Sequence, residues 1–238
     1  MTTADNILLS VRHATKRFGG VLAVHDCSLD VRANVIAGLI GPNGSGKTTL
    51  FNLITGLEQL DAGEIVFRGR RIAGLRPHQV FHLGISRTFQ IIRVFPHMTA
   101  LENMVAVANG SRAANRAKAL ELLEFVNLAR LKDEYAGNLS YGQQKLLEFV
   151  RALMTDPELI LLDEPAAGVN HTLLNDLLGR IRQLKEGGKT ILIVEHDMKV
   201  VMNTCEIIYV MDAGKMIVEG LPAEIQRDER VIEAYFGR

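Results

Sequence analysis

The stretch from Gly41 to Thr49 combines glycines, a lysine and hydroxyl side chains, all suited to binding phosphate. A phosphate loop requires a glycine, four further residues and then Gly-Lys-Ser/Thr, and the sequence supplies Gly41, Gly46, Lys47 and Thr48 in that spacing. Glycines let the backbone take positive φ angles, so that successive N–H groups converge on phosphate oxygens. We expect Lys47 to reach the β- and γ-phosphates of a nucleoside triphosphate and Thr48 to hold Mg²⁺. The predicted nucleotide-binding residues of this loop are Gly41, Pro42, Asn43, Gly44, Ser45, Gly46, Lys47, Thr48 and Thr49.

The segments on either side of this loop fit the strand and the helix that the pattern requires. Residues 35–40 are mainly apolar, as in a short strand buried on both faces. Residues 49–54 predict a helix whose positive N-terminal end points at the same phosphates. The alternative interpretation is a glycine-rich turn between a strand and a helix that binds no ligand.

Ionisable side chains follow two further apolar segments. Residues 159–162 are aliphatic and precede Asp163 and Glu164, while residues 190–194 are followed closely by His196. Ligands of parallel sheets bind at the carboxyl ends of the strands, so these side chains should meet the phosphate loop at one edge. We expect Asp163 to support Mg²⁺, Glu164 to orient or deprotonate the attacking water, and His196 to face the γ-phosphate.

Gln90 is predicted to end a strand beside the phosphate site, where its side chain would reach Mg²⁺ or the attacking water. A solitary glutamine is otherwise an ordinary polar residue. The residues that follow, 91–98, form an apolar patch interrupted by a proline. Large apolar side chains gathered in a loop indicate a docking surface, and the alternative is that Phe95 and Met98 cover a local core.

Ser140 and Gln143 have the spacing of a capping box at the start of a helix. A helix N-terminus fronted by a serine hydroxyl and Gly142 is also a site for an anion, so this segment is either a helix cap alone or a second phosphate site.

Phe18 lies in a basic turn beside glycines. Its ring either stacks on an adenine or packs as a local core residue.

The composition limits the classes of protein that the chain can represent. It has 238 residues, of which 47% are hydrophobic, and a formal net charge of +0, so it can bury a real core but lacks the basic excess of a nucleic-acid binder. No segment approaches the roughly 18 apolar residues of a membrane span, and no apolar signal segment begins the chain. We therefore expect a cytosolic protein that reaches a membrane only through a partner. Cys27 and Cys205 lack metal spacing and are expected to be buried thiols.

The order of the segments predicts one α/β domain over residues 1–238 with a helical insertion. About 1–90 and 157–238 should form the core together with an antiparallel β subdomain, and about 91–156 should form the helical subdomain, because that segment is rich in alanine and leucine. Strands of the antiparallel part are expected near 7–11, 21–24, 27–31 and 61–69, and a hairpin near 207–219.

Together, the phosphate loop, Gln90, residues 139–144, the Asp163-Glu164 pair and His196 resemble, in this order, the motifs of ABC-type ATPase subunits. The resemblance covers essentially the whole chain. It implies a P-loop NTPase fold with a RecA-like parallel-sheet core, an N-terminal antiparallel β subdomain and an inserted helical subdomain. It also implies that two subunits enclose two ATP molecules head to tail.

The resemblance assigns roles to the candidate residues. Phe18 corresponds to the aromatic residue that stacks on adenine. Ser140, Gly142 and Gln143 correspond to the signature that one subunit presents to the ATP held by its partner. Gln90 belongs to the loop that couples to a membrane subunit, and His196 is the switch histidine at the γ-phosphate. The implied catalytic residues are Lys47, Gln90, Glu164 and His196, and the implied Mg²⁺ residues are Thr48, Gln90 and Asp163.

Two positions depart from the usual ABC pattern. Tyr141 replaces a glycine of the signature, and Asn170 stands where an aspartate is commoner. These features, together with residues 87–90, 95–99 and 234–237, look like the ATPases of branched-chain amino acid importers. The ATPases of lipopolysaccharide exporters and urea importers are similar through much of the chain.

The hypothesis from this resemblance is an ATP- and Mg²⁺-dependent subunit that drives uptake of branched-chain or other hydrophobic amino acids. It would sit peripherally on the cytoplasmic face of the cell membrane. Its partners would be two membrane-spanning permease subunits and a second ATPase subunit, identical or related. A periplasmic or extracellular solute-binding protein would act indirectly, and no nucleic acid would be bound.

Other classes of protein remain as alternatives. One is the ATPase of a lipopolysaccharide or urea transporter. Another is a soluble ABC ATPase that remodels proteins, ribosomes or iron–sulfur assemblies, and the apolar patch at 91–98 argues against it. A P-loop kinase would explain neither residues 139–144 nor His196.

Overall fold

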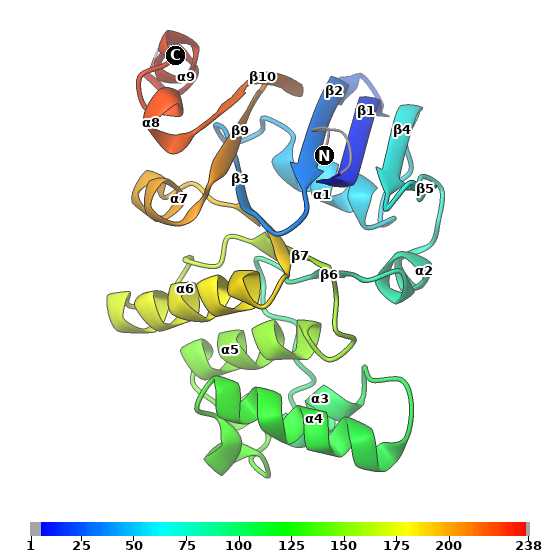
Figure 1. Cartoon of the computed structure of the whole chain (residues 1–238), viewed down its shortest axis with the longest axis vertical. Coiled ribbons are helices and arrows are strands. Elements are labelled where there is room, and N and C mark those ends of the chain that lie inside the picture. The colour runs from blue at the N-terminus through cyan, green and yellow to red at the C-terminus, as the bar shows by residue number, and fades with distance from the viewer. Residues whose placement is uncertain (1–5, 237–238) are drawn as a thin grey trace.

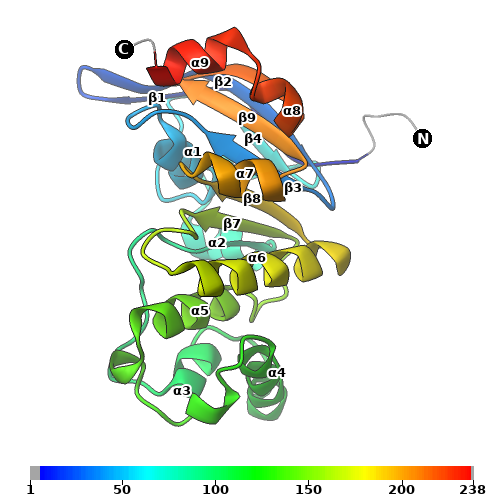
Figure 2. The same ribbon diagram turned by 90° about the vertical axis from the view of Figure 1, so that its left-hand side faces the viewer.

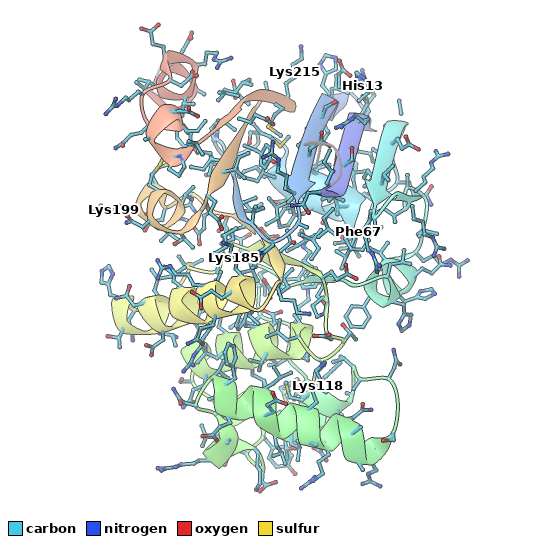
Figure 3. The ribbon with its side chains drawn as sticks, in the orientation of Figure 1. His13, Phe67, Lys118, Lys185, Lys199 and Lys215 are labelled. Carbon is cyan, nitrogen blue, oxygen red and sulfur yellow. The ribbon has the colours of Figure 1, made fainter. Side chains whose placement is uncertain are left out.

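The computed structural model describes residues 6–236, so Gly237 of the C-terminal segment lies outside the described residues. The molecule is elongated, with two sheets at one end and a group of helices at the other (Figure 1). His13 in the first strand lies in the upper part of Figure 3, and Lys118 in the helical group lies in the lower part.

A six-stranded sheet forms the core of the domain, and its strands have the order β10-β9-β3-β8-β7-β6. All neighbouring pairs are parallel except β9 with β10, which form the predicted hairpin. Every residue of β3, β7 and β8 is buried, as expected for strands covered on both faces. The strands are β3 (Ile36–Ile40), β6 (Ile85–Arg87), β7 (Leu159–Asp163), β8 (Thr190–Val194), β9 (Ile207–Asp212) and β10 (Lys215–Gly220).

The side chains of β7 divide between two hydrophobic clusters because successive residues of a strand face opposite sides. Ile160 and Leu162 pack in the cluster that includes helices α5 (Tyr141–Ala152) and α6 (His171–Glu186). Leu159 and Leu161 pack in the cluster that includes helix α1 (Lys47–Ile54) and the N-terminal strands. The sheet is therefore fixed from both faces, and Figure 2 shows α6 and α7 (Met198–Thr204) in front of it.

A second, antiparallel sheet has the order β2-β1-β4-β5. The sequence predicted three short strands where the structure has one long hairpin. That expectation was wrong because bulges interrupt the alternation of polar and apolar residues. His13 and Asp26 both have positive φ angles, 51° and 52°, and the register shifts beside them. The strands are β1 (Ile7–Phe18), β2 (Val21–Arg32), β4 (Ala62–Phe67) and β5 (Arg70–Arg71).

The chain between β6 and β7 is largely helical and leaves the sheet before returning to it. Helix α5 of this part packs in the same hydrophobic cluster as Ile160 and Leu162 of β7, and its Leu147 and Val150 are fully buried. The remaining helices of this part are α3 (Ala100–Val105), α4 (Arg112–Phe125), η2 (Ala129–Leu131) and η3 (Ala136–Asn138). Outside it lie α2 (Pro77–His82), α8 (Pro222–Ile225) and α9 (Glu229–Phe236).

Candidate functional site

The loop after β3 has the backbone that a phosphate cradle requires. Gly41, Gly44 and Gly46 have φ angles of 150°, 81° and 103°. A Cβ added at Gly41 would overlap the carbonyl oxygen of Met211, and one at Gly46 would overlap that of Ala23. These two positions therefore admit only glycine, and the loop can curl closely around a ligand.

Lys47 begins α1, and its ammonium lies inside the curve of this loop. Nζ donates to the carbonyl oxygens of Gly41 and Pro42, at 2.8 and 3.0 Å, and to Ser45 Oγ at 3.4 Å. Burial lowers the pKa of Lys47, and the nearby carboxylates of Glu164 and Asp163 oppose that shift. Since the hydrogen-bond partners of the ammonium are neutral oxygens, a phosphate group fits this position as a stronger acceptor.

Asp163 ends β7 and forms a buried ion pair. Its Oδ2 accepts from an Nη of Arg87 at 2.7 Å, and both side chains are 5% exposed. The other Nη of Arg87 donates to Asn52 Oδ1 of α1 at 2.6 Å. The pair thus ties β6, β7 and the helix of the phosphate loop together, which fixes the carboxylate at the strand end.

Three predicted residues meet at the carboxylate of Glu164. Its Oε2 accepts from Gln90 Nε2 at 2.9 Å and lies 3.7 Å from His196 Nδ1. The Glu164 backbone has a φ angle of 49°, which is unusual for a residue other than glycine. Seven other non-glycine residues within 6–236 also have positive φ angles, so the angle at Glu164 defines the turn and does not by itself mark a functional site.

Gln90 reaches this cluster from a loop and not from a strand end. The predicted strand stops at Arg87, and only the Thr88 amide continues the ladder by donating to Leu161 O at 3.0 Å. Thr88 Oγ1 then accepts from the Asp163 amide at 3.4 Å, so the chain leaves the sheet there.

Mg²⁺ fits the donor set at this edge. Thr48, Gln90 and Asp163 supply oxygens of the kind that Mg²⁺ prefers, and this ion is usually held by one or two protein groups together with phosphates and water. Binding of Mg²⁺ in this way does not require a complete set of protein ligands. No group of three or more His, Cys, Asp and Glu side chains suited to a metal ion occurs within residues 6–236.

The second predicted anion site lies apart from the phosphate loop. Ser140 caps α5: its Oγ accepts from the Gln143 amide at 3.3 Å, and Gln143 Oε1 accepts from the Ser140 amide at 2.9 Å, so the capping box is confirmed. Ser140, Gly142 and Gln143 line a hollow of about 460 Å³ together with residues 168–170, 172 and 173. No residue of the loop 41–49 lines it, so one chain presents two separate anion-binding candidates.

The aromatic ring of Tyr141 packs on the backbone of Gly168. A Cβ added at Gly168 would lie 2.8 Å from Tyr141 Cε1. The structure therefore accommodates Tyr141 by placing a glycine opposite its ring. Asn170 caps α6 by accepting from the Leu173 amide at 2.9 Å.

Phe18 ends β1 and is 45% exposed, so it is not a local core residue. The Lys16 ammonium lies 5.1 Å from the centre of its ring. The exposed ring remains available for stacking.

The buried thiols predicted at Cys27 and Cys205 are confirmed.

The apolar patch at 91–98 divides between exposed and covered side chains. Ile91 and Phe95 are 79% and 46% exposed, whereas Met98 is half-buried. Asn103 holds this loop by accepting from the Phe95 amide at 2.8 Å and donating to the Phe95 carbonyl at 3.0 Å. Beside it lies a cleft of about 300 Å³ between α2 and α5, lined by Thr55, Leu57, Pro77, His78, Val80, Phe81, Ile85, Arg87, Phe89, Val107, Glu148, Arg151 and Ala152.

Three buried charged side chains that shape the site are not identified by the sequence patterns: Arg87, Lys145 and Glu195. Glu195 accepts from the Ala166 amide at 2.6 Å and the His196 amide at 3.1 Å, and burial raises its pKa while these amides oppose the rise. Lys145 donates to main-chain carbonyls beyond β7. In the sequence, Glu195 directly follows the apolar segment 190–194 and Lys145 lies within the predicted helix after Ser140, but their main-chain partners are not visible there.

Comparison with known proteins places these features in a family. The family model described as ABC transporter matches residues 24–167, and the one described as branched-chain amino acid ATP-binding cassette transporter matches residues 215–238. The high-affinity branched-chain amino acid transport ATP-binding protein LivG of Salmonella typhimurium is 40% identical, over 97% of this chain and 98% of that protein.

Solved structures agree with this comparison. The ADP conformation of MJ1267, an ATP-binding cassette of an ABC transporter, has a TM-score of 0.88 at 37% identity and covers 98% of this chain and 99% of that one. The dimeric post-hydrolysis state of the cassette MJ0796, bound to ADP and Pi, has a TM-score of 0.81 at 26% identity and covers 90% and 99%.

Replacing Lys47 by alanine removes the ammonium from the phosphate loop. We expect the Kd for ATP to rise roughly 10- to 100-fold, because a charge-assisted contact with phosphate is lost. Isothermal titration calorimetry measures this change. Lys189→Ala serves as the control, since that ammonium pairs with Asp156 at 2.8 Å before β7 and β8 begin. An unchanged ATP affinity in Lys47→Ala would contradict the proposed phosphate cradle.

Proposed function

The chain belongs to the ABC transporter family of ATP-hydrolysing subunits, and from this membership we propose that it energises the uptake of branched-chain amino acids. The observation that supports the chemistry best is the meeting of Gln90, Glu164 and His196 at one carboxylate oxygen. The named relatives and the C-terminal family model support the solute class.

In the proposed reaction, the backbone amides of residues 41–49 and the Lys47 ammonium bind the β- and γ-phosphates of ATP. Phe18 stacks on the adenine. Thr48 and Gln90 would hold Mg²⁺, with Asp163 supporting it, and the ion supplies positive charge to the phosphates. Glu164 orients the attacking water and accepts its proton, while His196 contacts the γ-phosphate.

A second ATPase subunit completes the proposed site. Ser140, Gly142 and Gln143 would contact the ATP held by that subunit, because their hollow is separate from the phosphate loop of the same chain. The amide groups at the start of α5 suit the γ-phosphate, since a helix N-terminus attracts anions. The second subunit is either an identical copy or a related chain.

Two permease subunits are the proposed membrane partners, one for each ATPase subunit. The cleft between α2 and α5 has an apolar lining with Glu148 and Arg151 among it, which suits a short helix with apolar and charged side chains. Exposed Ile91 and Phe95 lie in the loop that follows Gln90, so docking there would act on the catalytic cluster. We also propose residues 91–156 as the helical subdomain, which carries Ile91, Phe95 and the α5 side of this cleft.

The proposed location is the cytoplasmic face of the cell membrane, as a peripheral subunit. None of the helices in residues 6–236 has the length and hydrophobicity needed to cross a membrane. Contact with the membrane would therefore be made through the permeases, and a solute-binding protein outside the cell would act only through them.

Glu164→Gln removes the proposed base while keeping the size of the side chain. We expect ATP hydrolysis to slow by roughly 100-fold or more, because proton transfer from water is worth about this factor. ATP binding should remain, so the dimer should accumulate in size-exclusion chromatography with ATP. The control is Glu158→Gln, because Glu158 precedes β7 and pairs on the surface with Arg68 at 2.7 Å. Hydrolysis at the parental rate would show that Glu164 is not the base.

Phe95→Ser tests the docking surface. We expect the permeases that copurify in mild detergent to fall on the order of tenfold, as for loss of an aromatic anchor. Quantitative mass spectrometry measures their amount. Ile232→Ser is the control, because Ile232 is an exposed apolar residue on α9 at the opposite end of the molecule (Figure 1). Copurification of soluble proteins alone, with either variant or the parent, would favour a remodelling ATPase.

A further inference from the structure

Lys145 connects the helix of the signature to the main chain of the proposed base. It lies on α5, the helix that Ser140 caps, and only 7% of it is exposed. Its Nζ donates to the carbonyl oxygen of Glu164 at 3.0 Å and to that of Ala167 at 2.6 Å. Hydrogen bonds from an ammonium are stronger than those between neutral groups, so Nζ fixes both carbonyls, and without these partners the buried charge would be costly.

The turn after β7 needs such support. Glu164 has a φ angle of 49°, a conformation that costs about 1 kcal/mol or more in a residue with a Cβ. Its amide donates to Val194 O of β8 at 2.9 Å, and the Ala166 amide donates to Glu195 at 2.6 Å. The sheet thus holds one side of the turn, and Lys145 holds it from α5.

The start of α5 also packs directly on the segment that follows this turn. The ring of Tyr141 lies on Gly168, and the side chain of Leu173 occupies the space beside Gly142. The N-terminus of α5 and residues 164–173 therefore contact each other at several points. Because of these contacts, a shift of the N-terminus of α5 would move residues 164–173 with it.

We propose that Lys145 is a positioning residue, which holds the Glu164 carbonyl and thereby links anion binding at the Ser140 site to the orientation of the Glu164 carboxylate. The inference rests on the proposed function, in which Glu164 is the base and Ser140 contacts the partner's ATP. It explains why a lysine is buried at this point of α5. It also connects the Ser140 site and the Glu164 carboxylate physically through one helix, α5.

The test compares Lys145→Met, Lys145→Arg and Glu164→Gln with the double variant Lys145→Met/Glu164→Gln in the full chain. We expect Lys145→Met to lower kcat by about 10- to 100-fold, the usual effect of a misplaced catalytic group, with the Kd for a nonhydrolysable ATP analogue within about twofold. Lys145→Arg should recover part of kcat, because its guanidinium also donates to carbonyls. Lys189→Met is the matched control, since its ammonium pairs with Asp156 at the other end of β7 and β8.

The double variant separates positioning from general support of the fold. If Lys145 acts through the carboxylate, Lys145→Met should change the residual rate of Glu164→Gln by no more than about twofold. A parental kcat in Lys145→Met, or the same loss in both backgrounds, would overturn the positioning role. A parental rate in Glu164→Gln itself would instead overturn the proposed base. If Lys145→Met does not fold, Lys145→Gln, whose amide keeps an N–H donor, takes its place under the same criteria.

Discussion

The structure depends on the parallel pairing of β3, β7 and β8, because this pairing brings the carboxyl ends of three strands to one edge. β8 pairs with both β3 and β7, so the phosphate loop, Glu164 and His196 start from adjacent strands although they are far apart in the sequence. The strands are buried on both faces, and a one-residue shift of register would exchange their side chains between two differently packed hydrophobic clusters. The geometry of the site follows from this hydrophobic constraint.

Buried charges then set the fine positions at that edge. Arg87 joins Asp163 to the helix of the phosphate loop, and Glu195 holds the amides of both the β7 and the β8 turns. Lys145 adds the connection to α5. Such groups are expensive to bury, but they make directional bonds that a purely apolar core lacks. The protein thus keeps an uncommon backbone conformation at Glu164 between a rigid sheet and a helix that belongs to the proposed dimer interface.

Much of this arrangement could be predicted from the sequence because it rests on local patterns. The glycine spacing of the loop, the apolar strands before Asp163 and His196, and the cap at Ser140 each have a local signature. The long strands β1 and β2 could not be predicted, since bulges at His13 and Asp26 shift the pattern. The roles of Lys145 and Glu195 depend on main-chain partners that leave no mark in the sequence. The position of Gln90 could not be predicted from the sequence, because β6 ends at Arg87 and the loop that follows brings Gln90 to Glu164.

In the proposed mechanism, Glu164 positions the water that attacks the γ-phosphate of ATP. The most direct measurement is a crystal structure of the full chain with Mg²⁺ and a nonhydrolysable ATP analogue. We expect a water within about 3 Å of the Glu164 carboxylate and in line with the γ-phosphate, with Ser140 of a second chain on the same phosphate. A γ-phosphate whose in-line water contacts other residues, with Glu164 turned away, would show that Glu164 does not position the water.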